Sequence, residues 1–252
     1  MRSLKLGLQL YTVREEAQKD LLGTLRRVGR MGYEGVEFAG TFGVPAAQVK
    51  AVLAETGLVP AGLVFSKQEL ETTRKQAFDY AHELGCTTLL FPWLDEPLRG
   101  SPSAYESSAE MLNGFGQACH EAGLRLLYHI HGYEFERYGD RTGLDILMAH
   151  LNPAWVGIEL DTYWVAHGGA DPLRVFLQCA SRCPYLHLKD MKDRRTEHDT
   201  EVLDGVLGLA GLIPIARRAG VEWLIVEQEQ FDRPPLESAA ISLANLKRVV
   251  RS

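Results

Sequence analysis

Metal-binding side chains end four successive apolar segments in the second half of the chain. Charged groups at the ends of apolar strands are costly to bury unless an opposite charge compensates them. A divalent cation held by carboxylates and imidazoles provides that charge, so the pattern indicates a metal-dependent enzyme. In chain order, the residues are His129, His131, Glu134, Asp161, His187 and Glu227.

Three of these residues form the core of the predicted metal site. Asp161, His187 and Glu227 each close a strand-like run, and adjacent strand ends would bring them together. The fourth ligand is open between Glu134 and the two histidines of the preceding segment, because side-chain alternation cannot be followed past Gly132. A carboxylate-rich set with one imidazole suits one divalent ion, Mn²⁺ first, then Mg²⁺ or Co²⁺, and it also tolerates Zn²⁺.

Further polar residues at predicted strand ends face the same region. Lys189 lies two positions beyond the histidine of the third segment, where it would polarise a carbonyl or form an ion pair with Glu159 or Asp161. On the first two predicted strands, Gln9 and Glu37 are expected to bond substrate hydroxyls.

The remaining candidates serve substrate binding and proton transfer. Trp164 follows the sixth predicted strand, where its aromatic face would stack on a sugar ring. His129, if it is not a ligand, would contact the substrate or hold a carboxylate ligand. Glu134 and Glu227 are candidates for a general base and its conjugate acid, and His131 or His129 is a third.

Short apolar runs and longer amphipathic runs alternate eight times along the chain. The predicted strands are Lys5–Tyr11, Gly35–Ala39, Val59–Phe65, Thr87–Trp93, Arg125–His131, Val156–Asp161, Tyr185–Lys189 and Trp223–Gln228. The predicted helices are Asp20–Met31, Pro45–Thr56, Lys67–Leu84, Ala104–Ala122, Gly143–His150, Pro172–Arg182, Ala210–Ala219 and Leu236–Arg251. Eight strand–helix units in about 250 residues are what an α/β fold needs to close a (β/α)₈ TIM barrel, here one domain over residues 1–252. An open doubly wound sheet is disfavoured, because no GxGxxG motif follows the first strand.

A barrel would explain how residues far apart in sequence meet. Side chains alternate along a strand, so Glu159 and Asp161 face the same way, as do His129 and His131. In a TIM barrel, inward-facing residues at the carboxyl ends of the strands converge on one mouth, where these enzymes place their chemistry. The predicted ligands therefore share one site.

The composition argues against several other classes of function. The net charge is −6, which disfavours a nucleic-acid-binding protein, because such a surface needs a clustered basic face. No apolar stretch approaches the roughly 20 residues that span a bilayer, so a membrane protein is not expected. The four cysteines form no CxxC pair, which favours a reducing compartment, and we predict a cytoplasmic protein. Assembly into a homo-oligomer is left open.

Five stretches of the chain resemble the sugar phosphate isomerase/epimerase family of xylose-isomerase-like TIM barrels. The resemblance implies that Asp161, His187 and Glu227 are metal ligands and that Glu134 matches the acid of strand five. The chain departs from the family at Ile130, where an asparagine is usual, and at Gly132, where an aspartate often follows. Leu203-Asp204-Gly205 also replaces the usual Gly-x-Gly after strand seven. The resembling stretches are Leu6–Arg14, Met31–Phe38, Tyr128–Phe135, Leu160–Val165 and Leu186–Asp190.

The expected chemistry is proton transfer next to a carbonyl. A metal ion that chelates a carbonyl oxygen and a neighbouring hydroxyl lowers the cost of forming an enediolate. Our main hypothesis is therefore an isomerase or epimerase whose partner is a small-molecule sugar or keto-sugar. The alternative is a dehydratase or lyase that removes a β-hydroxyl from a keto-sugar or inosose. Phosphodiester hydrolysis, as in endonuclease IV, is disfavoured because it needs a larger metal cluster and a basic groove.

Overall fold

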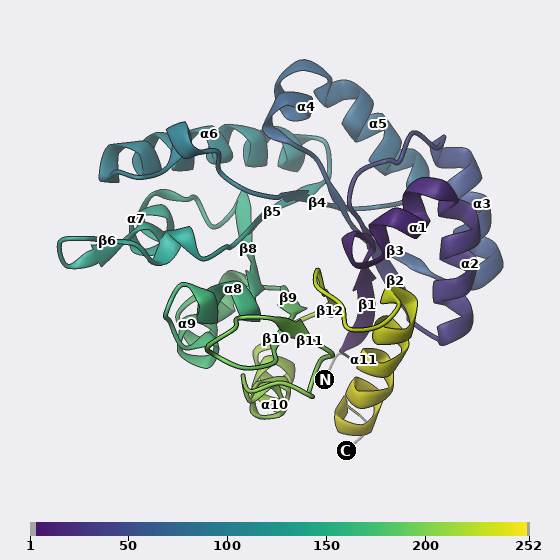
Figure 1. Ribbon diagram of the computed structural model, residues 1–252. Helices are drawn as coiled ribbons and strands as arrows, with labels where there is room; N and C mark the ends of the chain where they lie inside the picture. Colours follow the sequence, from purple (N-terminus) through teal and green to yellow (C-terminus); the bar gives the residue numbers. More distant parts are fainter. Residues whose placement is uncertain (1–3, 251–252) are drawn as a thin grey trace.

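Eight parallel strands close into a barrel in the computed structural model, which describes residues 4–250 (Figure 1). Each strand pairs with two neighbours in the order β1, β2, β3, β4, β5, β8, β9, β12, and β12 returns to β1. The strands are β1 (Lys5–Gln9), β2 (Gly35–Phe38), β3 (Val59–Val64), β4 (Thr88–Phe91), β5 (Arg125–His129), β8 (Val156–Asp161), β9 (Tyr185–Leu188) and β12 (Trp223–Val226). The predicted (β/α)₈ TIM barrel is confirmed.

Helices connect the strands and surround the barrel (Figure 1). They are α1 (Arg14–Lys19), α2 (Leu21–Met31), α3 (Ala46–Thr56), α4 (Lys67–Thr72), α5 (Arg74–Leu84), α6 (Pro102–Glu121), α7 (Gly143–His150), α8 (Thr162–His167), α9 (Pro172–Cys179), α10 (Leu209–Ala219) and α11 (Pro235–Val250). Short 3₁₀ helices are η1 (Leu10–Val13), η2 (Glu96–Leu98), η3 (Tyr133–Phe135) and η4 (Ala180–Arg182). Two-stranded ribbons pair β6 (Arg137–Tyr138) with β7 (Arg141–Thr142), and β10 (Asp190–Met191) with β11 (Asp199–Thr200). Over residues 4–250, each helix is too short or too polar to cross a bilayer.

Several strands end earlier than predicted, at the mouth where the site lies. β5 stops at His129, so His131 belongs to the following loop. β12 stops at Val226, one residue before Glu227. At the end of β1, the Gln9 side chain accepts a hydrogen bond from the N–H of Tyr11 at 3.0 Å and turns the chain into η1. At β1, a polar side chain thus replaces a ladder hydrogen bond, which an apolar-run argument does not foresee.

The helices differ from the prediction in several places, and α1 was not predicted. The predicted helix over residues 67–84 is divided at Thr73, where Thr72 and Thr73 direct their hydroxyls to the carbonyls four residues back, at 2.7 and 3.1 Å. Such back-bonding competes with regular helix geometry. α8 was not predicted; it begins after Asp161, which accepts a hydrogen bond from the N–H of Trp164 and caps it. Position 251 of the last predicted helix lies outside the described residues.

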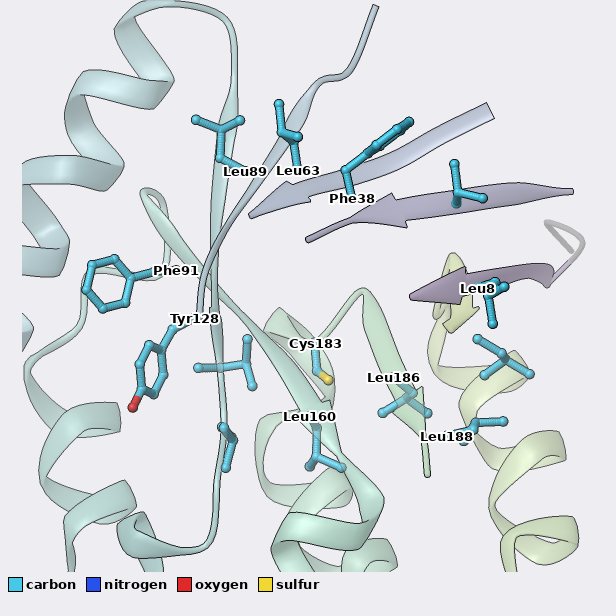
Figure 2. Packing of buried hydrophobic residues seen from close by; sticks show 14 of the residues in the cluster. Leu8, Phe38, Leu63, Leu89, Phe91, Tyr128, Leu160, Cys183, Leu186 and Leu188 are labelled. Atoms are coloured by element: carbon cyan, nitrogen blue, oxygen red, sulfur yellow. The ribbon is translucent and has the colours of Figure 1, made fainter. Parts of the chain in front are cut away.

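The two faces of the strands bury different layers. Outward-facing residues such as Leu8, Phe38 and Leu63 pack between the strands and the helices (Figure 2). Inward-facing residues fill the base of the barrel with a separate apolar cluster of Ala61, Leu90, Leu127, Tyr185, Trp223 and Ile225. Gly35 makes room for this layer, because a Cβ there would lie 2.4 Å from Cη2 of Trp223. The inward positions above this layer are polar, and they form the site.

Candidate metal centre

Four buried side chains from four strands converge at the mouth of the barrel. His129 ends β5, Asp161 ends β8, His187 lies in β9, and Glu227 follows β12. One ligand atom from each of them lies within 4.8 Å of the others. The structure thus brings together Asp161, His187 and Glu227, and it adds His129 as the fourth member.

His187 lies at the centre of this group. Its Nδ1 is 2.8 Å from Oε2 of Glu227 and 4.0 Å from Oδ2 of Asp161. Its Nε2 is 2.9 Å from Oε1 of Glu37 and 3.2 Å from Oε2 of Glu159. Because carboxylates accept hydrogen bonds and cannot donate them when ionised, we place the ring proton on Nε2. The Nδ1 lone pair is then directed at the group of ligands.

His129 is oriented by the carboxylate of Glu159. Its Nδ1 lies 2.8 Å from Oε2 of Glu159, its partner in register across β5 and β8. A proton on Nδ1 leaves Nε2 as the lone-pair nitrogen. Glu159 therefore accepts a hydrogen bond from His129 and lies within ion-pair distance of Nε2 of His187, which is hydrogen-bonded to Glu37. Together the two glutamates fix which nitrogen of each ring is free to bind a metal.

Asp161 supplies an oxygen that the fold leaves unused. Oδ1 accepts the hydrogen bond from the Trp164 N–H at 2.9 Å. Oδ2 is buried and has no hydrogen-bond partner among residues 4–250. A buried, unsatisfied carboxylate oxygen is costly, and a cation would remove the cost. Two imidazoles and two carboxylates fit a divalent ion such as Mn²⁺, Co²⁺ or Zn²⁺.

The carboxylates around His187 create a negative potential. Burial alone would lower the pKa of His187, but Glu159 and Glu37 raise it well above its usual value. Burial, and then the charge of Glu159, raises the pKa of Glu37 to about 8. The pKa of Asp161 is also raised well above its usual value, chiefly by burial. Protons bind tightly here when no cation does, so metal binding would release them.

Glu134 does not occupy the place that the sequence suggested. It is buried, and its Oε1 accepts a hydrogen bond from the Tyr128 hydroxyl. Its Oε2 accepts one from the N–H of His131 at 3.0 Å. Both oxygens are thus engaged in holding the loop after β5, because η3 turns the chain there. We therefore replace Glu134 by His129 in the candidate ligand set.

A cavity of about 470 Å³ opens beside the candidate ligands. Its walls include Gln9 and Glu37, as expected for substrate contacts, and also His129 and His131. Gln9 donates a hydrogen bond to Glu37 at 2.5 Å, and Oε2 of Glu37 has no partner within the described part of the chain. Nδ1 of His131 is likewise unpartnered within residues 4–250. The cavity is of the size that small-molecule sites have.

Lys189 is placed differently from the expectation. Its ammonium group pairs with Glu229 and lies 3.8 Å from Oδ2 of Asp199, so the expected pairing with Glu159 or Asp161 is wrong. The side chain is buried below the rings of Tyr163 and Trp164, and Nζ is 4.8 and 4.9 Å from their centroids. Such contacts indicate a role in packing and charge balance.

The structure gives Glu159 a role that the sequence analysis did not assign, and it shows the surroundings of Trp164. Glu159 was considered only as a partner of Lys189, although its position two residues before Asp161 already placed it on the inward face. Trp164, expected to stack on a substrate, contacts the ring of His131 with the centroids 5.2 Å apart. It lines a second hollow beside the cavity.

The chain belongs to the xylose isomerase-like TIM barrel family, whose model matches residues 25–249. A sugar phosphate isomerase/epimerase from Parabacteroides distasonis has the same fold, with a TM-score of 0.83 and 22% identity over 97% of this chain and 98% of the other. The IolI protein, whose structure holds a zinc atom, has a TM-score of 0.78 and 14% identity over 98% of each chain. The expected family resemblance is confirmed.

The curated relatives correct the expected reaction. An inosose dehydratase from Geobacillus kaustophilus is 28% identical over 246 residues, covering 82% of this chain and 79% of the relative. Another, from Bacillus cereus, is 26% identical over 79% of this chain and 78% of the relative. These relatives are dehydratases, so the isomerase or epimerase hypothesis is wrong and the dehydratase alternative is favoured.

Proposed function

We propose that this protein is a divalent-metal-dependent dehydratase that acts on an inosose or a closely related keto-sugar. The names of the curated relatives support the reaction, and the four convergent ligand atoms support the metal. The observation that carries the proposal is the orientation of His129 by Glu159 and of His187 by Glu37 and Glu159, which leaves one lone pair on each ring directed at the centre. The bound ion would act as a Lewis acid on the substrate carbonyl and acidify the neighbouring C–H.

The cavity walls supply the groups that handle protons and hydroxyls. His131 lines the cavity and is our candidate for the base that removes the proton beside the carbonyl. Glu37 and Gln9 would bond ring hydroxyls, and the unpartnered Oε2 of Glu37 is placed to contact the hydroxyl that leaves as water. We assign no catalytic role to Glu134 or Lys189, because other side chains already engage both.

The ligand set indicates the metal, and the cysteines indicate the compartment. Mn²⁺ stays our first choice, and Zn²⁺ is the second because two imidazoles now belong to the set. All four cysteines are free and buried thiols, which suits the reducing cytoplasm.

The test is product analysis with 2-keto-myo-inositol as substrate. The protein is stripped with a chelator, reloaded with Mn²⁺ or Zn²⁺, and incubated with the inosose. We expect a product that has lost one water, formed only by the metal-loaded protein. An isomer of unchanged mass, or no reaction by protein that has retained the metal, would contradict the proposal.

A further inference from the structure

A second hollow of about 670 Å³ adjoins the substrate cavity. Trp93 and His131 line both spaces, so the two meet at these side chains. The second hollow extends away from the metal ligands, between the segments that follow β4 and β5 and the helix α8 that follows β8. A single small ring at the metal centre would leave it unfilled. Its further lining residues include Arg99, Tyr133, Glu136, Trp164 and His167.

Aromatic rings in mutual contact form much of this lining. His131 stacks on Tyr133 with a centroid distance of 5.5 Å and an interplanar angle of 5°. On another side, His131 is 5.2 Å from Trp164, which meets His167 edge-on at 5.3 Å. Arg99 covers the Tyr133 ring, with Cζ 4.1 Å from the centroid. The rings hold one another in place before a ligand arrives.

Trp93 is exposed and nevertheless anchored. Its side chain is 51% exposed, which is unusual for a residue of this size. Its indole N–H donates a hydrogen bond to Oδ1 of Asp95 at 3.1 Å. The next residue, Leu94, donates its N–H to the Tyr133 hydroxyl at 2.7 Å. A fixed, solvent-facing aromatic ring loses little conformational entropy when it binds a flat apolar surface.

We infer that this hollow is a subsite for a second ring carried by the substrate, so that the preferred substrate is a keto-sugar bearing a ring substituent. The inference rests on the proposed function, since it places the keto ring at the metal. His131 would stand between the two rings. The C–H face of a sugar ring or the face of an aromatic substituent would stack on Trp93 and Trp164. Arg99 and Glu136 at the wall would bond polar groups of the substituent.

The probes are the methyl and phenyl ethers of an inosose, substituted at the ring carbon opposite the carbonyl so that both β-hydroxyls stay free to leave as water. Because aromatic stacking is worth about tenfold in affinity, we expect the phenyl ether to have a KM roughly tenfold below that of the methyl ether. In Trp164→Leu, and separately in Trp93→Ala, the ratio of the two KM values should fall to about one. Leu177→Ala, which removes an exposed leucine from α9, is the control and should keep the wild-type ratio.

The outcomes separate this inference from the proposed function. If inosose is dehydrated and the wild-type KM ratio of the two ethers is one, the subsite is refuted while the proposed function stands. If nothing is turned over, calorimetric binding of the two ethers to the metal-loaded protein gives the ratio directly. A ratio of about ten that both tryptophan variants abolish supports the subsite. A ratio that both variants retain refutes it.

Discussion

Oε2 of Glu159 lies 2.8 Å from Nδ1 of His129, its register partner on the neighbouring strand. The same oxygen lies 3.2 Å from Nε2 of His187. Glu159 thus contacts two imidazoles, from β5 and β9, and orients His187 together with Glu37, which accepts the hydrogen bond of Nε2 at 2.9 Å. Glu159 is itself outside the candidate ligand set. The arrangement predicts that Glu159 controls metal affinity from behind the ligands.

Replacing Glu159 should weaken metal binding in a graded way. Glu159→Leu removes the acceptor and should raise the Kd for Mn²⁺ about 10–100-fold, the usual cost of losing such a partner. Glu159→Gln keeps a neutral acceptor and should fall between this variant and the wild type. Isothermal titration calorimetry measures all three. Glu55→Leu, on the exposed face of α3, is the control, and an unchanged Kd in Glu159→Leu would show that the imidazoles are oriented by other means.

Substitutions of His129 and His131 should affect metal binding and proton transfer separately. His129→Gln removes a candidate ligand, so this variant should lose bound metal and activity together. His131→Gln should keep the metal and lose about 10²–10⁴-fold in kcat, the range for removal of a general base. Metal content by atomic absorption and steady-state rates provide the comparison. Loss of metal from both variants, or from neither, would contradict the two assignments.

Lys189 should matter for stability. Lys189→Met leaves Glu229 and the buried Asp199 without their cation, so we expect a loss of about 3–5 kcal/mol in the free energy of unfolding. Urea denaturation measures it. Lys192→Met breaks an exposed, solvent-screened pair with Asp232 and should change the stability far less than Lys189→Met does. Equal stabilities of the two variants would contradict the structural role of Lys189.

Glu134 should make stability depend on pH. Burial raises its pKa from 4.5 to about 7, so its folded carboxyl holds a proton more tightly than the unfolded one. The protonated Glu134 carboxyl therefore stabilises the folded state, and this stabilisation is present below pH 4.5 and is lost as pH rises through about 7. By linkage, the loss is about 3 kcal/mol between these limits.

Glu134→Gln is the direct test, because the amide can donate to the Tyr128 hydroxyl while its oxygen accepts the His131 N–H. The free energy of unfolding of this variant, relative to the wild type, should rise between pH 4.5 and 7.5. Urea titrations across this range, with Glu121→Gln on the surface of α6 as control, measure the difference. A difference that stays constant with pH would mean that Glu134 titrates normally.

The sequence predicted the barrel because each strand–helix unit has its own local signal. Glycines end helices at Gly32 and Gly85, both with positive φ, and apolar runs mark each strand. Alternation in β8 correctly turned Glu159 and Asp161 to the same face, because both lie within a regular strand. Inside regular elements, one-dimensional periodicity was sufficient.

Prediction failed where the strands end. Glu134 lies in a 3₁₀ turn whose direction depends on hydrogen bonds with Tyr128 and the backbone of His131, and neither follows from spacing. The partners of Lys189 are Asp199 and Glu229, which lie in the β10–β11 ribbon and in the loop after β12. Such loop contacts are tertiary, so a periodic pattern carries no information about them.

The central claim is that one divalent ion, held by His129, Asp161, His187 and Glu227, enables dehydration. Its most direct test is a titration of chelator-stripped protein with Mn²⁺ while the rate of inosose dehydration is followed. We predict that the rate rises linearly and stops rising at one ion per chain. Asp161→Asn should show little rate at any point, while Asp171→Asn, which makes the same change at the helix cap of α9, should match the wild type. Full activity in the stripped protein, without added metal, would contradict the account.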